Sequence, residues 1–360
     1  MKTNLIYILG MMCLSGTVSA QTTVNYTEFE QKVLDYSQTL KQSVSQRTAM
    51  QKAMKAAKTA FFPAVDATGS YQYRINKYDM DFGGMAVPME HDSYSAEVGV
   101  VQPIYAGGSI YHTYKASQIQ SQIADKSVDL TTDNLIYAAE ASYWGTAAQK
   151  EMYKTMCQYV EIISQLTKVL QDKYDDGYIS KTDLIQMQTR LKEAELQRSS
   201  SYQSYQIALQ NMNVLMGLEP DKEVGLVDSI FVELPLPAYV GADAALNVRP
   251  DYAISQLDVD YQKRQVKLAA AKYNPSLSIG FKETWGTQML NISGETMFNS
   301  NVYASVKLPL FHWGARFKST AAQKAILLGK QYALQDKQDQ ITKEVAKAWT
   351  SLTENTHQID

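Results

Sequence analysis

Histidine, cysteine and glycine are the residue types of this chain that could support metal binding, nucleophilic attack or phosphate binding. The histidines are His91, His112, His312 and His357. None of them stands at metal-ligand spacing from another or from Cys157. The glycine pairs Gly83-Gly84 and Gly107-Gly108 lack the Lys-Ser or Lys-Thr step of a phosphate-binding loop, which indicates turns. The sequence therefore predicts no catalytic residue, no metal and no cofactor.

Charge and the amino terminus narrow the class of protein. The chain has a formal net charge of −3 and no dense basic patch, so nucleic acid is not an expected partner. A charged start, an apolar middle and the small residues Val18-Ser19-Ala20 are typical of a secretory signal peptide at residues 1–20. Its removal would leave Cys157 as the only cysteine, which excludes an internal disulfide. No later segment has about 18 consecutive apolar residues, so only strands could enter a membrane.

One stretch occurs twice and organises the rest of the chain. In residues 98–109 and again in residues 304–315, a strand pattern ends, the chain turns, and a long helical pattern begins. A second repeated step leads from helix into strand at Phe62-Pro63 and at Asn274-Pro275. The sequence therefore predicts a duplicated helix, strand, strand, helix unit. Its corners are expected at Pro63, Pro103, Gly108, Pro275, Pro309 and Gly314.

The four predicted strands alternate between apolar and polar residues. Such alternation is most often a half-buried strand in a soluble antiparallel sandwich, but both copies keep the same facing. Aromatic residues also stand at the strand ends, as at membrane surfaces: Tyr105, Phe311 and Trp313 beside the helices, and Tyr78, Tyr94 and Trp285 beside the loops. Closed barrels need about eight strands, so several chains would have to build one barrel. The expected lipid-facing residues are Val65, Ala67, Tyr71, Ala96, Val98, Val100, Leu277, Ile279, Val302 and Val306.

Long helical patterns surround these strands. Thr27 and Glu30 form a capping-box pattern that begins a helix to about Phe62. A helix from Ser109 to about Tyr174 would be about 100 Å long, which exceeds any globular core. Gly177 interrupts the helical pattern before a second helix follows. Coiled-coil spacing is found at Tyr159, Ile163, Leu166 and Leu170, and at Leu184, Met187, Leu191 and Ala194.

In this order, the features resemble the outer membrane efflux protein family, the TolC-like channels. The resemblance covers essentially the whole mature chain. Its local matches are Gln102-Pro103-Ile104-Tyr105 with Gly107-Gly108, Leu308-Pro309-Leu310-Phe311, Arg249-Pro250-Asp251, and Gly177 through Asp183-Leu184. The resemblance implies a mainly α fold with membrane β structure, in which four strands from each chain of a homotrimer contribute to an oligomeric β-barrel. The barrel would lie in the outer membrane and the helices in the periplasm.

The resemblance also implies a function. The chain would be the passive exit duct of a tripartite efflux or type I secretion system, without enzymatic activity. Its partners would be a periplasmic adaptor, an inner-membrane pump and outer-membrane lipid. The adaptor is expected to dock on the turn between the first two long helices, at Asp176, Gly177, Tyr178, Ile179 and Asp183. Two alternatives are a periplasmic structural coiled-coil protein without channel activity and a periplasmic enzyme.

The expected domains follow the duplication. The first repeat is residues 21–218, a linker or equatorial segment is residues 219–245, and the second repeat is residues 246–360. The second repeat is expected to lack its final helix, as in a truncated chain. The last helix would then have an apolar stripe without a partner, formed by Ala322, Ile326, Leu327, Ala333, Leu334, Ile341, Val345 and Trp349.

Overall fold

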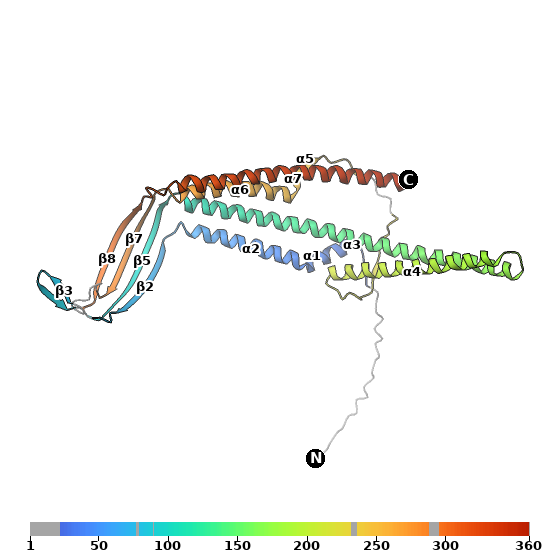
Figure 1. The fold of residues 1–360 in the computed structure, drawn as a ribbon, viewed down its shortest axis with the longest axis horizontal. Coiled ribbons are helices and arrows are strands. Elements are labelled where there is room, and N and C mark those ends of the chain that lie inside the picture. Colours follow the sequence, from blue (N-terminus) through green and yellow to red (C-terminus); the bar gives the residue numbers. More distant parts are fainter. Residues whose placement is uncertain (1–21, 77–78, 89, 232–235, 288–294, 360) are drawn as a thin grey trace, which may run out of the picture. The chain divides into compact units, whose positions relative to one another are not determined.

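The computed structural model describes residues 22–76, 79–88, 90–231, 236–287 and 295–359, and the predicted signal peptide lies outside these ranges. The chain divides into one unit of residues 1–38 and 133–234 and a second of residues 39–132 and 235–360. None of the described helices is long and apolar enough to cross a membrane. The fold is mainly helical, with long helices and a few strands (Figure 1).

The helix, strand, strand, helix order occurs twice in the second unit, which contains the amino-terminal part of α3 (Figure 1). The first copy consists of α2 (Gln38–Thr59), β2 (Ala64–Tyr73), β5 (Asp92–Ala106) and α3 (Ser109–Asp175). The second copy consists of α6 (Pro250–Ala271), β7 (Ser276–Gly286), β8 (Met297–Lys307) and α7 (Ala315–Ile359). The predicted duplication of this element order is therefore confirmed.

The four long strands form one antiparallel sheet in the order β2-β5-β7-β8. The β5–β7 ladder joins the two copies, and β2 and β8 are the edge strands. The segment between β2 and β5, expected to be a loop, contains a short hairpin of β3 (Asp79–Phe82) and β4 (Met85–Pro88). Gly83 and Gly84 form its turn, both with positive φ, which glycine adopts without steric cost.

Glycine is required where β5 turns into α3. Gly107 has φ +64°, and a Cβ there would lie 2.6 Å from the carbonyl oxygen of Ala271. The Asn274 amide donates to the Gly107 carbonyl at 2.9 Å, which fixes this corner against the end of α6. The sequence emphasised Gly108, whose φ is +88°, but a Cβ there would meet only His112. Gly107 is therefore the glycine that close packing demands.

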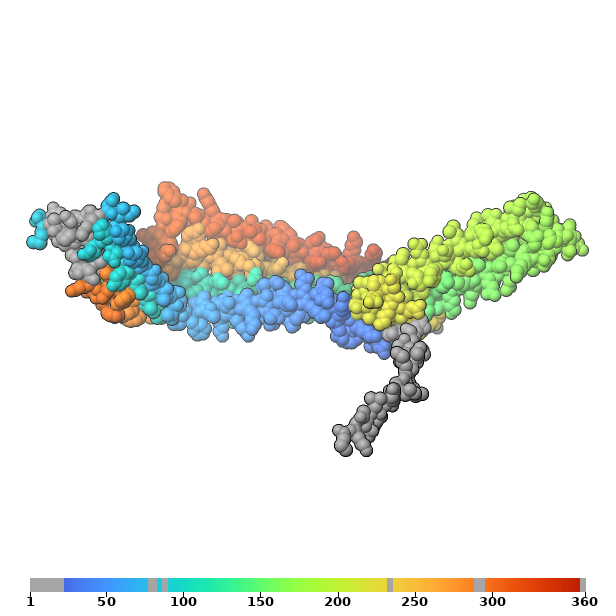
Figure 2. Space-filling view, turned by 90° about the horizontal axis from the view of Figure 1, so that it is seen from below, coloured from blue at the N-terminus to red at the C-terminus, as the bar shows by residue number. Residues whose placement is uncertain are grey.

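The first unit contains a helical hairpin made of the carboxyl-terminal part of α3 and α4 (Lys181–Leu215), which run side by side (Figure 2). Leu184 and Ala194 are buried on α4, as the heptad spacing predicts. On α3 the buried position is Val160, whereas the predicted Tyr159 and Leu166 are each 42% exposed. The predicted Ile163 and Leu170 are half-buried, so the predicted seam on α3 is confirmed at these two positions and wrong at Tyr159 and Leu166.

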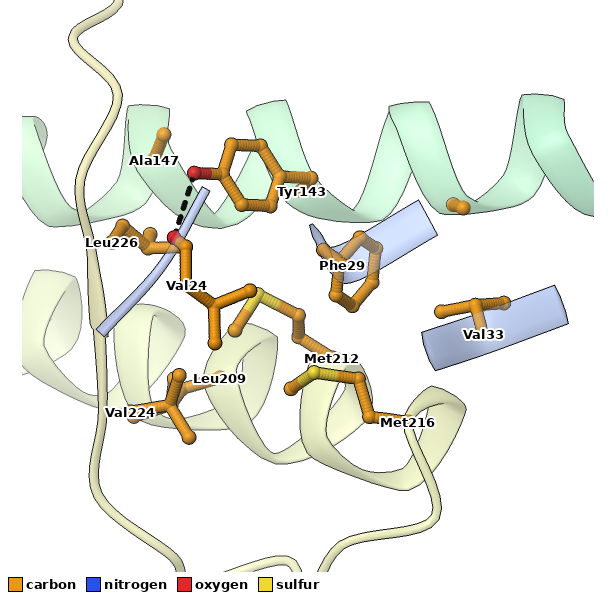
Figure 3. Close-up of a cluster of buried hydrophobic side chains, with 11 residues drawn as sticks. Val24, Phe29, Val33, Tyr143, Ala147, Leu209, Met212, Met216, Val224 and Leu226 are labelled. Carbon is orange, nitrogen blue, oxygen red and sulfur yellow. Dashed lines mark hydrogen bonds between the residues drawn. The ribbon is translucent and has the colours of Figure 1, made fainter. Parts of the chain in front are cut away.

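A buried core lies beside this hairpin (Figure 3). It includes β1 (Thr22–Val24), α1 (Tyr26–Tyr36) and β6 (Val224–Leu226), and β1 pairs in parallel with β6. Asn25 accepts from the Glu28 amide at 2.8 Å and is the N-cap of α1, so the predicted N-cap Thr27 is wrong. The helix expected from there to Phe62 is also divided, because α1 ends before Ser37 and α2 follows.

The Asp228 carboxylate connects the strands and helices of this core. One of its oxygens accepts from the Tyr143 hydroxyl at 2.8 Å and from the Tyr26 amide at 2.7 Å. The same Tyr143 hydroxyl also lies 3.1 Å from the Val24 carbonyl (Figure 3). Burial, reinforced by the Asp228 hydrogen bond, raises the pKa of Tyr143 above its usual range, so Tyr143 remains a donor.

The apolar stripe of α7 is not without partners, contrary to the prediction. Ile341 is fully buried, and α7 packs against α6 and α5 (Ala242–Val248). The Arg249 guanidinium binds Asp251 at 2.8 Å and Glu344 at 2.7 Å, which ties the start of α6 to α7. Trp349 contacts the ring of Tyr239 at 5.1 Å. Of the predicted stripe, Ala322, Ile326 and Ala333 remain exposed.

Replacing Asp228 with alanine is expected to loosen β1 and β6. The buried Tyr143 hydroxyl and the half-buried Tyr26 amide would lose their shared acceptor, at a cost of about 2 kcal/mol. Hydrogen exchange of residues 22–28 and 224–227 should become roughly 30-fold faster, because local opening follows that free energy. Asp221→Ala is the control, since the exposed Asp221 carboxylate accepts from the Gln210 side chain at 2.9 Å and does not join β1 to β6. Equal exchange in both variants would contradict this role of Asp228.

Candidate functional site: sheet face and hairpin tip

The strand register places the ten predicted apolar residues on one face of the sheet. Val65 pairs with Val100 and Ala67 with Val98 between β2 and β5. Residues that pair directly in an antiparallel ladder point to the same side. By the same pairing, the β5–β7 and β7–β8 ladders place four further residues on this face: Leu277, Ile279, Val302 and Val306. Much of this face is exposed, with Val98 at 50% and Val302 at 84%.

A bulge in β5 adjusts this face where the strand approaches its helix. The register against β7 shifts between Pro103 and Tyr105, so that Tyr105 pairs with Leu277. The extra residue moves Tyr105 onto the apolar face, where regular alternation would have put Ile104. Proline lacks the N–H that a regular ladder would use, which favours a bulge here. Pro103 therefore lies inside β5 rather than at the corner, where the sequence predicted it.

The opposite face of the sheet is polar. The hydroxyl groups of Ser70 and Ser95 are hydrogen bonded at 2.8 Å across β2 and β5. Lys282 and Glu97 form an ion pair at 2.5 Å across β5 and β7. A cavity of about 760 Å³ lies at the loop end of the sheet, lined largely by serine, threonine, glutamine and asparagine side chains. The sheet therefore has one largely apolar face and one polar face.

Aromatic residues lie near both ends of the strands. Tyr94 and Trp285 are in contact at the loop end, with ring centroids 5.6 Å apart. Phe311 and Trp313 are in contact at the helix end, 4.9 Å apart, and both rings are largely exposed. Tyr78, which the sequence assigned to the same loop-end group, lies outside the described residues.

Sequence reasoning missed one polar pair on the apolar face. Glu283 lies between Val98 and Ser300 in the register, and its carboxylate accepts from the Ser300 hydroxyl at 2.5 Å. Glu283 is two residues from Phe281 in the same strand, so the alternation itself could have assigned it to this face. It lies two residues past the centre of β7 and two residues before Trp285.

The tip of the helical hairpin is a tight turn. Gly177 has φ +81°, and the Tyr178 amide donates back to the Lys173 carbonyl at 2.8 Å, which closes α3. The Tyr178 side chain is 79% exposed, but Ile179 is half-buried, so the expectation of two exposed apolar residues holds only for Tyr178. Asp183 forms a reciprocal capping box with Ser180, which gives it a structural role at the start of α4.

The sequence matches the outer membrane efflux protein family over residues 30–218 and 241–360. The chain belongs to this family. The family is one of outer membrane proteins, and the protein accordingly lies in the outer membrane, with its helices in the periplasm. The family and its fold are those of channel proteins.

Individual members of the outer membrane efflux protein family are only distantly similar. The alkaline protease secretion protein AprF of Pseudomonas aeruginosa is 21% identical over 278 residues, which are 75% of this chain and 57% of AprF. The chain thus spans little more than half the length of that relative. The Campylobacter jejuni CmeC outer membrane channel aligns over 87% of this chain and 67% of its own, at 16% identity and a TM-score of 0.73. The Vibrio cholerae outer membrane protein VceC aligns over 91% and 78%, at 15% identity and a TM-score of 0.74.

The residue types that bind metal are spread over the part of the chain that the structure describes. Its histidine, cysteine, aspartate and glutamate residues form no group of three that could hold a metal ion. Cys157 is a free, half-buried cysteine. The candidate functional surfaces of this efflux family member are therefore the two faces of the sheet and the hairpin tip.

Replacing Gly177 with valine is expected to disorder the hairpin tip. A Cβ at this position would meet nothing within 4 Å, so the cost is conformational. A β-branched residue at positive φ should cost about 1 to 3 kcal/mol. Protease cleavage between residues 173 and 183 should increase, while Gly177→Asn should behave almost as the original protein because asparagine tolerates this conformation. If valine and asparagine give the same cleavage rate, backbone strain does not determine the turn.

Proposed function

We propose that this protein is the outer-membrane exit duct of a tripartite efflux or type I secretion system. It acts as a passive conduit and carries out no catalysis. The observation that supports this most directly is the four-stranded sheet, which has one exposed apolar face, one polar face and two edge strands. The distant similarity to a secretion protein and to outer membrane channels supports the same function.

The apolar face is proposed to contact lipid. In water, an exposed apolar sheet with free edges is an aggregation hazard. In a bilayer the same face is favourable, provided that every backbone N–H and C=O is paired. Glu283 is an acidic residue on this face, and the hydrogen bond from the Ser300 hydroxyl partly satisfies its carboxylate. The lipid contacts are Val65, Ala67, Tyr71, Ala96, Val98, Val100, Leu277, Ile279, Val302 and Val306.

The free edges of the sheet favour assembly with further copies. The four strands alternate in direction, so β8 of one chain would meet β2 of the next in antiparallel orientation. The barrel could then close with antiparallel pairing throughout. Three copies of this sheet would give a twelve-stranded barrel with no edge. The polar face, with its serine hydroxyls and the Lys282–Glu97 pair, would line a hydrated passage.

The hairpin tip is the proposed docking point for a periplasmic adaptor, which in turn contacts an inner-membrane pump. Its turn is held by Gly177 and by the Ser180–Asp183 capping box, so it presents a fixed shape. Tyr178 offers an exposed ring with Asp175 and Asp176 beside it. An exposed aromatic residue with a polar rim is a typical protein-binding feature.

The proposal is tested by measuring conductance. The protein, purified from outer membranes in detergent, should form an oligomer that resists dissociation without heating and conducts ions across a planar lipid bilayer. Release from membranes by salt or carbonate alone, with no conductance, would overturn the proposal and favour a periplasmic coiled-coil protein.

A lysine at Val302 should prevent assembly in the membrane. A cation on the lipid face near the midplane costs about 2 to 4 kcal/mol, whereas a lysine on the polar face remains hydrated. Val302→Lys, at the centre of β8 and opposite Phe281, should therefore lower the yield of heat-resistant oligomer in outer membranes, and Ser70→Lys, the control on the opposite face, should not. Equal yields from the two variants would show that the apolar face does not meet lipid.

A charge at Tyr178 should abolish export without affecting assembly. Tyr178→Asp places a carboxylate where the proposed adaptor contact is apolar, and Tyr178→Phe keeps the ring as the matched control. The aspartate variant should form normal oligomer with normal conductance but lose export of a dye by cells, by tenfold or more if the contact resembles other aromatic anchors. Loss of the oligomer would instead assign Tyr178 a structural role.

A further inference from the structure

A cationic cavity lies in the second unit, between helices of the two repeated copies. Its volume is about 540 Å³, and its walls come from α3, α6 and Leu327 of α7. In the sheet order β2-β5-β7-β8, the two central strands are β5 and β7. Helix α3 follows β5, and helix α6 precedes β7. The cavity therefore occupies the seam between the copies, and nothing in the duct proposal depends on it.

Positive charge converges on this cavity. Lys115 of α3 and Lys263, Arg264 and Lys267 of α6 line it, with Asp260 as the one acidic lining residue. Asp260 is already paired with Lys263 at 2.8 Å. Lys115 donates to the neutral Gln118 amide at 3.0 Å. Within the described ranges, Arg264 and Lys267 have no carboxylate within salt-bridge distance, so about three positive charges remain uncompensated in a chain of net charge −3.

His112 lies beside this cavity and is affected by its positive charges. His112 lies one turn before Lys115 on α3 and has no hydrogen-bond partner at its buried Nδ1 atom. Burial lowers the pKa of His112, and the charges of Lys267 and Arg264 lower it further. The part of this shift that is due to charge comes from two of the cations that line the cavity.

Most of the other lining residues are apolar, and the neutral polar ones are Gln118 and Gln122. Ile119, Leu257, Val266 and Leu327 form the walls between the cations. Apolar walls exclude water and strengthen the attraction between a bound anion and the surrounding charges. Arginine presents a planar fork of donors that fits phosphate oxygens, and lysine adds mobile point charges. A cavity of this size has room for a phosphate group and for part of the molecule that carries it.

We propose that this cavity binds a phosphate group, held by Lys115 from one copy and by Arg264 and Lys267 from the other. The bound anion would neutralise the cations and link α3 to α6. Two sources offer this chemistry: inorganic phosphate in solution, and the phosphodiester of an anionic phospholipid. Lys115 is six residues after the start of α3, which places it about 9 Å along the helix from the end of the sheet. If the sheet spans the hydrocarbon core, the headgroup layer begins at this end and is roughly 6 Å thick, so Lys115 lies close to it.

The test measures binding of both sources to the purified full-length oligomer. Inorganic phosphate is titrated calorimetrically in detergent, and the phospholipid arm compares thermal stability in nanodiscs of phosphatidylcholine with and without phosphatidylglycerol. The double variant Arg264→Gln/Lys267→Gln removes two cations, and Lys115→Gln removes the one on the opposite wall. The control Lys272→Gln/Lys318→Gln removes two exposed lysines that do not line the cavity.

The original protein and the control are expected to bind at least one of the two probes. The double variant should bind that probe tenfold to a hundredfold more weakly, and Lys115→Gln about tenfold more weakly, as expected for charge-assisted hydrogen bonds. Loss of phosphate binding identifies the soluble anion, and loss of the stabilisation by phosphatidylglycerol alone identifies the lipid. Both results support the cavity as a phosphate site. The proposal is overturned if the original protein binds neither probe, or if the control weakens binding as much as the cavity variants.

Discussion

The β5–β7 ladder is the interaction on which the rest of the sheet depends. It joins residues 95–106 of the first copy to residues 276–286 of the second through antiparallel pairing. Side chains alternate between the two faces along each strand. If β7 slipped by one residue against β5, the apolar side chains of one copy would lie on the same face as the polar side chains of the other copy. The bulge at Pro103 belongs to the same constraint, since it lets Tyr105 share a face with Leu277 despite the proline. The single apolar face is therefore a product of this one register.

Local rules explain what the sequence predicts well. Alternation in β2 and β8 is a property of each strand, so it can be recognised without knowledge of the partner strand. The turn at Gly177 follows from the steric freedom of glycine at positive φ, which is a local property. At the corner between β5 and α3 the sequence predicted Gly108, and only the long-range approach of Ala271 shows that Gly107 is the position that requires glycine. The duplication strengthens the prediction, because the same element order can be recognised independently in each copy.

Long-range pairing explains what the sequence does not predict. β1 and β6 are three residues each, come from distant parts of the chain, and show no periodicity, so only the folded core reveals them. Asn25 rather than Thr27 caps α1 because two adjacent candidates compete and the packing of Phe29 and Val33 selects the start of the helix. The cationic cavity was missed for the same reason: Lys115 and Arg264 lie far apart in the sequence, and each alone is an ordinary helical cation.

Two of the helix seams in the second unit, α6–α7 and α3–α6, differ in their physical basis. Between α6 and α7, Val259 and Ile341 are buried, the side chains of Gln262 and Gln323 are hydrogen bonded at 2.8 Å, and opposite charges pair, as in the 2.7 Å contact of Arg249 with Glu344. Between α3 and α6 the cavity gathers like charges, whose repulsion falls as salt screens them. Backbone ladders hold this second seam at the sheet end, through β5 and β7 and the Asn274 bond to Gly107. The seam between the copies is thus fixed at one end by hydrogen bonds and depends, farther along, on whatever anion neutralises it.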